Sequence, residues 1–439
     1  MNNQYACVIN FGCRVNFYES NSIIKSLNEL GIQETKEREK ANYIIINTCT
    51  VTKRADLKNR STIRKIYNEN PNAKIIVTGC YATTDEDDII KIPGVFSVIN
   101  NEKKEIIPEL IKTDLKSKLN ISLKKFIYNE SARENNKSRA YLKVQDGCDR
   151  TCSYCKIPLA RGKAKSRNHI EVIEEAKEII NNNYKEIILT GINIGAYKDI
   201  NNYRLNNLIE DIINISGDFL IRISSIEPSN IIEKIIPLFQ SQKIARFLHI
   251  PLQSGSPQVL KKMRRTYTIK KYKNIINNIK NQYPEMHIGT DIILGFPGET
   301  EEDFKKTRHF CNENEFANIH VFKFSKREGT FIFNELEKKS KINTKEFLLL
   351  NKTEIQKRTE SMLTLKEALL KNYIKKTSGI KFKAIIEKIT KESVSITTEN
   401  YLKLNFSKSG FENFKKGDLI NLVYNKMGDI ISINNNLLK

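Results

Sequence analysis

Short apolar segments alternate with helical patterns twice along this 439-residue chain, and this rhythm restricts the fold more than any other feature. The first series has apolar segments at 5–9, 43–46, 74–78 and 95–99, separated by helical patterns at 17–30, 53–70 and 85–91. Alternation of this kind is typical of a parallel sheet covered on both faces by its crossover helices. We therefore predict a doubly wound α/β sheet over residues 1–100.

Three cysteines follow the first three strands of this predicted sheet. Cys13, Cys49 and Cys80 each lie two to four residues beyond a strand. The carboxyl ends of parallel strands form the ligand crevice of such folds, so we expect the three thiols to meet at one point. The alternative is three unrelated small residues in loops.

The second series is longer and follows a polar, charge-rich stretch at 101–137, which we interpret as a linker with one helix at most. Strands are predicted at 140–145, 186–190, 219–223, 246–250, 287–294 and 318–324, with helices between them. Six such units predict a partial (β/α)6 barrel over residues 138–372. Polar, glycine-rich strings follow these strands, at the end where barrels carry their chemistry.

A compact cysteine loop, Cys148-x3-Cys152-x2-Cys155, follows the first barrel strand. Three thiolates can ligate three corners of a cubane iron-sulfur cluster and leave the fourth iron open. A zinc site with His169 as fourth ligand and a Cys152/Cys155 redox pair are the alternatives. Of the eight cysteines, Cys7 and Cys311 lie in apolar patterns and are predicted to be buried as small hydrophobes.

The net charge of +22 favours a polyanionic partner such as nucleic acid. Lysines outnumber arginines by 55 to 18, a skew that an AT-rich coding sequence also produces, so the positions of the arginines are more informative. Four arginines lie near the first two cysteines in the sequence: Arg14, Arg54, Arg60 and Arg64. Their guanidinium groups suit phosphate or carboxylate, and the alternative is an ordinary solvated face. No apolar run approaches the length of a membrane span, and we expect a cytoplasmic protein that contacts no membrane.

The last segment, 373–439, follows a long helical pattern from about 343 to 373. Five short strand patterns occur at 381–389, 393–398, 401–406, 419–424 and 430–433, in a lysine-rich context. This pattern predicts a small β-barrel of the oligonucleotide-binding type.

These motifs together resemble a known family. The cysteine loop with Tyr154 before its last cysteine resembles the signature of radical S-adenosylmethionine enzymes. Phe-Gly-Cys13-Arg-Val-Asn, Asn-Thr-Cys49-Thr-Val-Thr and Thr-Gly-Cys80-Tyr-Ala resemble the amino-terminal domain of the methylthiotransferases. The string Thr-Glu-Asn-Tyr401-Leu-Lys resembles their RNA-binding TRAM domain, although Ile396 and Thr397 replace the usual glycine and aromatic residue.

The resemblance implies two 4Fe-4S clusters. Cys148, Cys152 and Cys155 would hold the cluster that binds and cleaves S-adenosylmethionine, and Cys13, Cys49 and Cys80 would hold the cluster that presents the transferred sulfur. It also implies cofactor-binding roles for Tyr154, which would pack on the adenine, and for residues on three strand-end strings: Gly191, Asn193, Glu227 and Gln253.

The family acts on three substrates: adenosine 37 of tRNA bearing a threonylcarbamoyl group, the same adenosine bearing an isopentenyl group, or an aspartate of a ribosomal protein. The string from Cys49 to Asp56 resembles the threonylcarbamoyl branch, and a carboxylate on the substrate would suit the four arginines. We predict methylthiolation of C2 in the anticodon stem-loop of tRNA, with an electron donor and a sulfur source still to be identified. A non-catalytic RNA-binding protein with structural metal and an electron-transfer protein are the competing classes.

Overall fold

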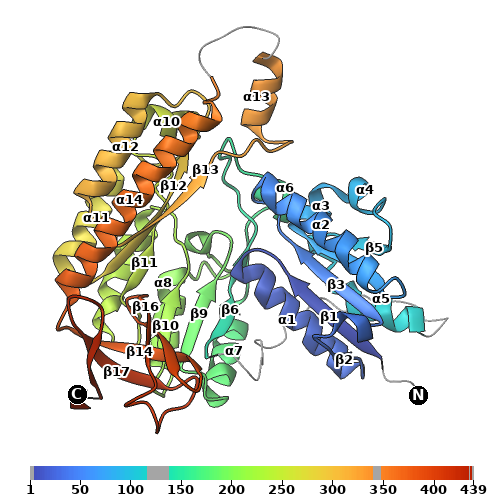
Figure 1. Ribbon diagram of the computed structural model, residues 1–439, viewed down its shortest axis with the longest axis horizontal. Coiled ribbons are helices and arrows are strands. Elements are labelled where there is room, and N and C mark those ends of the chain that lie inside the picture. The colour runs from blue at the N-terminus through green and yellow to red at the C-terminus, as the bar shows by residue number, and fades with distance from the viewer. Residues whose placement is uncertain (1–3, 116–137, 340–347, 435, 438–439) are drawn as a thin grey trace. The chain divides into compact units, whose positions relative to one another are not determined.

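The computed structural model describes residues 4–115, 138–339, 348–434 and 436–437, and its elements are labelled in Figure 1. The chain divides into two compact units. The amino unit comprises 1–134, 145–165 and 325–334, and the carboxy unit comprises 135–144, 166–324 and 335–439. The loop from Cys148 to Cys155 therefore belongs to the same unit as Cys13, Cys49 and Cys80. The domain boundaries at 100, 137 and 372 stay a prediction.

The amino unit contains a five-stranded sheet in which every pairing is parallel. Its strands are β1 (Tyr5–Asn10), β2 (Gln33–Glu34), β3 (Tyr43–Thr48), β4 (Lys74–Gly79) and β5 (Val95–Ile99). Their spatial order is β2-β1-β3-β4-β5, so the direction of winding changes between β1 and β3. Ligand crevices open at such a switch point in doubly wound sheets.

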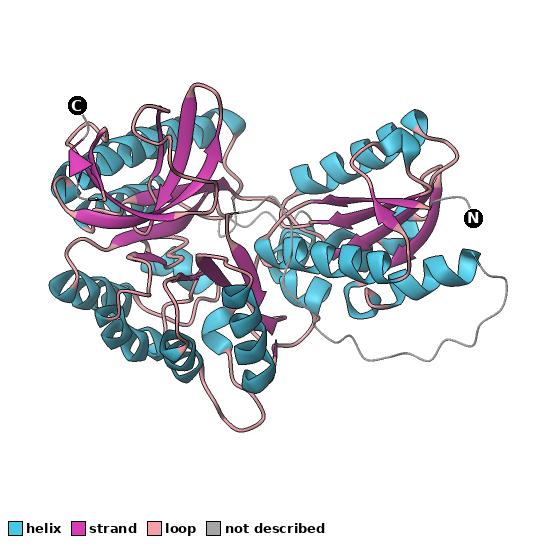
Figure 2. Ribbon diagram, turned by 90° about the horizontal axis from the view of Figure 1, so that it is seen from below, coloured by secondary structure: helices cyan, strands magenta, loops and turns pink. Residues whose placement is uncertain are grey.

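Helices cover both faces of this sheet (Figure 2). On one face Ile23 of α1 (Arg14–Glu29) and Ile107 of α5 (Ile106–Leu115) are buried in one cluster. On the other, Ile63 of α2 (Lys53–Glu69) and Ile89 of α4 (Glu86–Ile89) are buried in a second cluster, with α3 (Cys80–Thr84) between α4 and β4 in the chain. The predicted doubly wound fold is confirmed, and the one helix expected after residue 100 packs on the sheet.

The carboxy unit contains the six predicted barrel strands. They are β6 (Ala140–Lys143), β9 (Glu186–Thr190), β10 (Leu220–Ile223), β11 (Phe247–His249), β12 (His287–Leu294) and β13 (Asn318–Lys323). They form two parallel three-stranded sheets, ordered β10-β9-β6 and β11-β12-β13. Ile221 joins the sheets, because its N–H donates to Lys243 O at 2.6 Å and its carbonyl accepts from Ala245 N at 2.9 Å. The partial barrel is thereby confirmed.

The barrel helices alternate with these strands as the sequence predicts. They are α7 (His169–Asn181), α8 (Leu205–Asn214), α9 (Asn230–Ile235), α10 (Pro257–Lys262), α11 (Ile269–Gln282) and α12 (Glu301–Glu313). Two short strands, β7 (Gln145–Asp146) and β8 (Lys165–Ser166), flank the cysteine loop in the chain, and α6 (Ile157–Arg161) follows its last cysteine. Helix α13 (Phe331–Lys339) comes after β13.

A curled antiparallel sheet ends the carboxy unit. It follows α14 (Lys352–Thr377) and consists of β14 (Lys381–Ile389), β15 (Ser393–Thr398), β16 (Lys403–Ser407), β17 (Leu419–Tyr424), β18 (Ile430–Ile433) and β19 (Asn436–Leu437). Their order is β16-β15-β14-β17-β18-β19, a half-barrel that agrees with the predicted small β domain. The predicted start of α14, near residue 343, lies outside the described residues. Within the described ranges, no helix has the length and apolar character needed to cross a membrane.

The turn between β15 and β16 is buried against the barrel strands. Arg222 of β10 is fully buried and donates to Glu186 at 2.6 Å, to the Glu399 carbonyl at 2.9 Å and to the Thr398 carbonyl at 3.1 Å. Its guanidinium also lies 4.9 Å from the ring centre of Tyr401. The Thr-Glu-Asn-Tyr401 string therefore fastens the curled sheet to the barrel.

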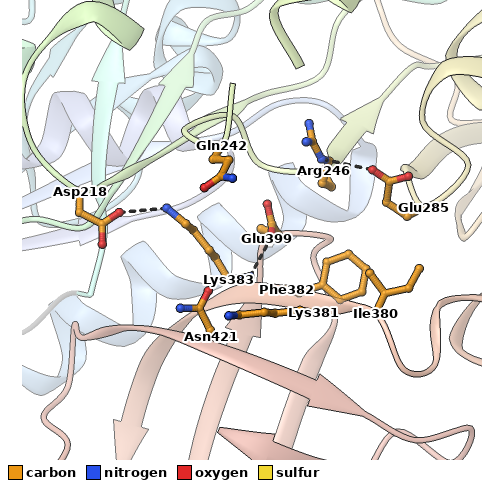
Figure 3. A pocket seen from close by; sticks show the side chains of 10 residues that line it. All are labelled: Asp218, Gln242, Arg246, Glu285, Ile380, Lys381, Phe382, Lys383, Glu399 and Asn421. Carbon is orange, nitrogen blue, oxygen red and sulfur yellow. Dashed lines mark hydrogen bonds and ion pairs between the residues drawn. The ribbon is translucent and has the colours of Figure 1, made fainter. Parts of the chain in front are cut away.

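A cavity of about 590 Å³ lies beside this contact, between the curled sheet and the amino ends of barrel strands (Figure 3). Four of its charged groups form ion pairs: Lys383 with Asp218 at 2.9 Å, and Arg246 with Glu285 at 3.3 Å. Barrel enzymes place their chemistry at the opposite, carboxyl end of the strands. We therefore interpret the cavity as a polar gap in the packing of the two sheets.

Candidate active site

The amino-terminal triad, Cys13, Cys49 and Cys80, lies at the carboxyl ends of β1, β3 and β4. Cys13 precedes α1 and Cys80 is the first residue of α3. A Cβ added to Gly12, whose φ is +103°, would lie 2.7 Å from Cys49 Cβ and 3.0 Å from its sulfur. The first loop thus passes directly over the second cysteine, and only glycine permits this approach.

Buried amide side chains hold these loops in place. Asn16 donates to Phe11 O at 2.8 Å and to Thr48 O at 2.9 Å, so it ties the Cys13 loop to the Cys49 loop. Asn59 of α2 donates to the Cys49 carbonyl at 2.6 Å. Burial raises the pKa of the Cys49 thiol to about 11, so this thiol stays protonated at neutral pH until a metal displaces the proton.

The loop triad, Cys148, Cys152 and Cys155, is assembled locally. Gly147 has φ +67°, and an added Cβ would overlap the Lys163 carbonyl. Cys148 N donates to Gly162 O at 3.1 Å, which closes the loop, and Cys155 N donates to Cys152 O at 3.1 Å. All three cysteines are half-buried, so their thiols remain accessible to a cluster.

The donor sets fit clusters better than single ions. Zinc holds each thiolate at about 2.3 Å, so two thiolates on one ion lie within about 4.6 Å of each other. Among the described residues, three ligand atoms of His, Cys, Asp or Glu come within 4.8 Å of one another only at His249, Asp291 and His320. Each cysteine triad offers three thiols, and a cubane places each of three thiolates on a different iron. His169, the predicted fourth zinc ligand, pairs with Asp199 instead.

The four predicted substrate arginines have different surroundings. Arg14 is half-buried in the first turn of α1, directly after Cys13, whereas Arg54 and Arg64 are exposed on α2. Arg60 donates to the Tyr81 hydroxyl and pairs with Asp88 at 2.9 Å, so it fastens α2 to the segment that carries Cys80.

A third segment of the chain supports the amino-terminal triad, and sequence reasoning missed it. Arg327 is buried and pairs with Asp56 at 2.6 Å, and it donates to Thr50 Oγ1 at 2.7 Å. Thr50 in turn donates to Asp56 at 2.8 Å. Thr50 and Asp56 thereby anchor residues 325–334 beside Cys49. The separation of 277 residues between Arg327 and Thr50 explains why no local pattern revealed this contact.

The predicted cofactor residues divide between the two units. Tyr154 lies half-buried in the cysteine loop of the amino unit. In the carboxy unit Gly191 and buried Asn193 follow β9, and Glu227 follows β10 and pairs with Arg265. Gln253, after β11, has φ +67° and donates its N–H to the Asp291 carbonyl at 2.7 Å.

Three polar side chains gather on adjacent strands of the barrel, a group to which the sequence analysis gave no role. His249 Nε2 lies 2.8 Å from Asp291 Oδ1, and His320 Nδ1 lies 3.3 Å from the same oxygen. Asp291 and His320 are direct partners in the β12–β13 register, and Gly289 leaves room for the His249 ring. A polar residue inside each of three consecutive strands was the available signal.

Comparison with known proteins places this geometry in a family. Residues 142–311 match the Radical SAM superfamily, and residues 5–100 match the uncharacterized protein family UPF0004. The chain is 37% identical over 410 residues to threonylcarbamoyladenosine tRNA methylthiotransferase MtaB of Bacillus subtilis, covering 90% of this chain and 88% of that protein. The chain belongs to the radical S-adenosylmethionine methylthiotransferase family.

Other relatives agree with this assignment. MtaB of Thermotoga maritima is 37% identical, covering 73% of this chain and 74% of the relative. A tRNA-2-methylthio-N(6)-dimethylallyladenosine synthase of Clostridium tetani is 34% identical, covering 73% and 74%. In fold, the chain is similar to the radical S-adenosylmethionine methyltransferase TsrM of Kitasatospora setae, with a TM-score of 0.60 at 13% identity, covering 78% of this chain and 79% of that one.

Membership of the methylthiotransferase family decides the class of protein and its cofactors. The cofactors are S-adenosylmethionine and 4Fe-4S clusters, and the chain is an enzyme rather than a binding protein with structural metal.

Proposed function

We propose that this enzyme transfers a methylthio group to C2 of N6-threonylcarbamoyladenosine at position 37 of tRNA, next to the anticodon. The observation that carries the proposal is the 37% identity to MtaB of Bacillus subtilis over nearly the full length of both chains. The string Asn-Thr-Cys49-Thr-Val-Thr-x2-Ala-Asp supports the same branch. We expect the enzyme to act on tRNA in the cytoplasm.

The six cysteines would hold the two clusters, Cys148, Cys152 and Cys155 one and Cys13, Cys49 and Cys80 the other. When bound, these groups supply the electron that cleaves S-adenosylmethionine and the sulfur that is transferred. The chain itself positions the cysteines that would hold the clusters. Gly12 lets the Cys13 loop cross Cys49, and Asn16 fixes the distance between the two loops.

Residues of the barrel rim would orient S-adenosylmethionine. Gly191 presents backbone without a side chain, and Asn193 and Gln253 offer amide groups at the carboxyl ends of two strands. Glu227 is positioned by its ion pair with Arg265. Tyr154 would pack on the adenine ring.

Arginines near Cys13 and Cys49 would recognise the substrate carboxylate. A threonylcarbamoyl group is anionic, whereas an isopentenyl group is apolar, so guanidinium groups favour the first. Arg14 is adjacent to Cys13 in sequence, and Arg54 and Arg64 lie exposed on the helix that follows Cys49. Arg60 already bonds to Tyr81 and Asp88, and we propose that it contributes by holding α2 in place.

Nucleoside mass spectrometry of tRNA tests the proposal. A strain that lacks the gene should lose 2-methylthio-N6-threonylcarbamoyladenosine and accumulate its unmodified precursor. The wild-type gene should restore the product, and a Cys152→Ala gene should not. Unchanged product in the deletion strain would contradict the proposal.

The isopentenyl substrate is the second candidate, because relatives with that name are also 33–34% identical. Purified enzyme should be offered both precursor tRNAs in one reaction. We expect methylthiolation of the threonylcarbamoyl tRNA alone, and preference for the isopentenyl tRNA would reassign the branch.

Replacement of Arg14 by Ala tests the carboxylate contact. The variant should keep iron in both clusters and cleave S-adenosylmethionine, but its KM for the precursor tRNA should rise about tenfold, as loss of one charged hydrogen bond implies. Arg38→Ala is the control, because Arg38 pairs with Glu69 and belongs to another loop of the same unit. An unchanged KM for Arg14→Ala would remove Arg14 from the substrate site.

A further inference from the structure

One buried arginine connects the two cysteine triads, and the proposed function gives it no role. Arg161 ends α6, the helix that begins two residues after Cys155. Its Nε donates to the sulfur of Cys80 at 3.3 Å. The segment that carries the loop triad thus reaches directly to a ligand of the amino-terminal triad, and both belong to the amino unit.

The remaining nitrogens of Arg161 are also occupied. One donates to Glu19 Oε1 and Asp146 Oδ1, both at 2.9 Å, and the other donates to the Asn16 side chain and to Glu19. The side chain is almost entirely buried, so the orientation of the guanidinium is fixed from all sides. An arginine held in this way keeps its Nε–H pointed at Cys80.

Neighbouring groups balance the charge and add a second contact to the same sulfur. Buried Lys104 pairs with Glu19, so two cations face the carboxylates of Glu19 and Asp146. Asn101 Nδ2 lies 3.6 Å from Cys80 Sγ and donates to Ala160 O at 2.6 Å. Because the carboxylates offset the two cations, the contacts specific to Cys80 are hydrogen bonds, and the shorter of the two comes from Arg161 Nε.

We propose that Arg161 is a positioning residue that sets the reduction potential of the amino-terminal cluster by donating to Cys80. Reduction adds negative charge to a cluster already ligated by thiolates, and hydrogen bonds to the sulfur favour the more negative state. Arg161 therefore makes this cluster easier to reduce. The proposal rests on the proposed function only in requiring that Cys13, Cys49 and Cys80 hold a cluster.

The full chain carrying Cys148→Ala, Cys152→Ala and Cys155→Ala isolates that cluster for measurement. After anaerobic reconstitution, iron analysis should give about four irons per chain, as for one cubane. A redox titration followed by electron paramagnetic resonance then yields one midpoint potential. Arg161→Lys in this background keeps a cation but removes the guanidinium Nε–H, and we expect the midpoint to shift to a more negative value.

Arg327→Lys is the matched control. Arg327 is also a buried, ion-paired arginine of the amino unit, but its described partners are oxygens of Thr50 and Asp56. It should shift the midpoint much less than Arg161→Lys does, because its guanidinium donates to oxygens rather than to a cysteine sulfur. An unchanged midpoint in Arg161→Lys, or an equal shift in Arg327→Lys, would overturn the proposal.

A measurement on the unsubstituted Arg161 covers the case in which Arg161→Lys fails to retain iron. The same triple-alanine chain is prepared with ¹⁵N-arginine, and electron-nuclear double resonance of its reduced cluster should show a ¹⁵N coupling. That coupling should persist in Arg327→Lys, and its absence from the labelled parent would overturn the proposal. Neither measurement uses tRNA, so a wrong substrate assignment would leave both results unaffected.

Discussion

The two cysteine triads use the same ligands in two different ways. The loop triad spans eight residues, and its shape depends on short-range hydrogen bonds such as Cys148 N to Gly162 O. The amino-terminal triad spans 68 residues and requires three parallel strands to end side by side. One site is a property of a loop, whereas the other is a property of a whole sheet.

The two triads share one backbone feature. Gly12, Gly79 and Gly147 each stand directly before a cysteine, and each has a positive φ. In all three places the backbone approaches another segment too closely for a Cβ. Cys49, which lacks such a glycine, is the cysteine over which the Gly12 loop passes. The difference between the triads therefore lies in what the glycine approaches, the same loop or another strand end.

The largest expected effect comes from removing one ligand of each triad. Cys152→Ala and Cys49→Ala should each reduce iron from about eight to about four per chain, because one cubane is lost. Cys152→Ala should abolish cleavage of S-adenosylmethionine, whereas Cys49→Ala should retain cleavage and lose only the methylthio product. Iron analysis, 5′-deoxyadenosine quantification and tRNA nucleoside analysis measure the three quantities.

Cys311→Ala serves as the control, since Cys311 is fully buried within α12 and distant in sequence from both triads. It should keep about eight irons, as a two-cubane protein does. Loss of S-adenosylmethionine cleavage in Cys49→Ala would mean that the two triads do not act separately.

Glycine substitutions should separate local from sheet-wide assembly. In Gly79→Ala, a residue with a Cβ must adopt φ +99°, and that Cβ overlaps the backbone of Thr48. The strain should destabilise the sheet by about 1–3 kcal/mol, and the overlap should add to this loss. Only the amino-terminal cluster should be weakened. Gly147→Ala should weaken the loop cluster. Urea unfolding of the metal-free chain and iron analysis are the measurements.

Gly31→Ala provides the control for strain without overlap, because φ is +79° but no atom lies within 4 Å of the added Cβ. It should cost about 1–2 kcal/mol and leave iron unchanged. Equal iron loss in Gly31→Ala and Gly79→Ala would show that the close approach to Thr48 has no special importance.

Acid should act on the carboxy unit through one buried histidine rather than through Cys49. The raised pKa of Cys49 keeps this thiol neutral in acid, so it takes up no proton there. Burial, aided by nearby Arg222, lowers the pKa of His287 to about 3, so the unfolded chain binds a proton below about pH 6.5 that the folded chain does not. By itself this histidine should lower the free energy of unfolding by about 1.4 kcal/mol per pH unit between pH 6.5 and 3. The raised pKa of Glu299, about 6, acts in the opposite direction over the upper part of this range.

His287→Phe should flatten this dependence, because the ring is retained and the titration is removed. Exposed His309→Asn should leave the slope as it is in the parent. Urea unfolding of the metal-free chain at pH 7, 6 and 5 gives the slopes, and identical slopes in parent and His287→Phe would contradict the assignment.

The smallest expected effect concerns the helix that follows Cys49. Thr52 caps α2 by accepting from Ala55 N at 3.2 Å, so Thr52→Ala should cost about 1 kcal/mol. Thr52→Ser keeps the cap and should be close to neutral. Thermal unfolding measures both, and iron content of the loop triad should remain unchanged in either variant.

The sequence predicted much of this architecture because periodic patterns report local structure. The four longer strands of the first series, the six barrel strands, the doubly wound sheet, the partial barrel and the burial of Cys7 and Cys311 followed from apolar periodicity. The two-residue strands β2, β7 and β8 were not predicted, because so short a stretch shows no period. The position of each triad cysteine relative to its strand followed as well. These features depend on neighbours within a few residues, which a single chain displays directly.

By itself, then, the sequence determined which elements form and which thiols stand at their ends. Only the tertiary structure decided which side chains meet: Arg161 with Cys80 across 81 residues, Arg327 with Thr50 across 277, and Arg60 with Tyr81 rather than solvent. Period and propensity carry no information about such partners, because a charged residue fits a solvated face and a buried pair equally well. The packing of distant segments selects between these states, since a buried charge needs a partner that only folding provides.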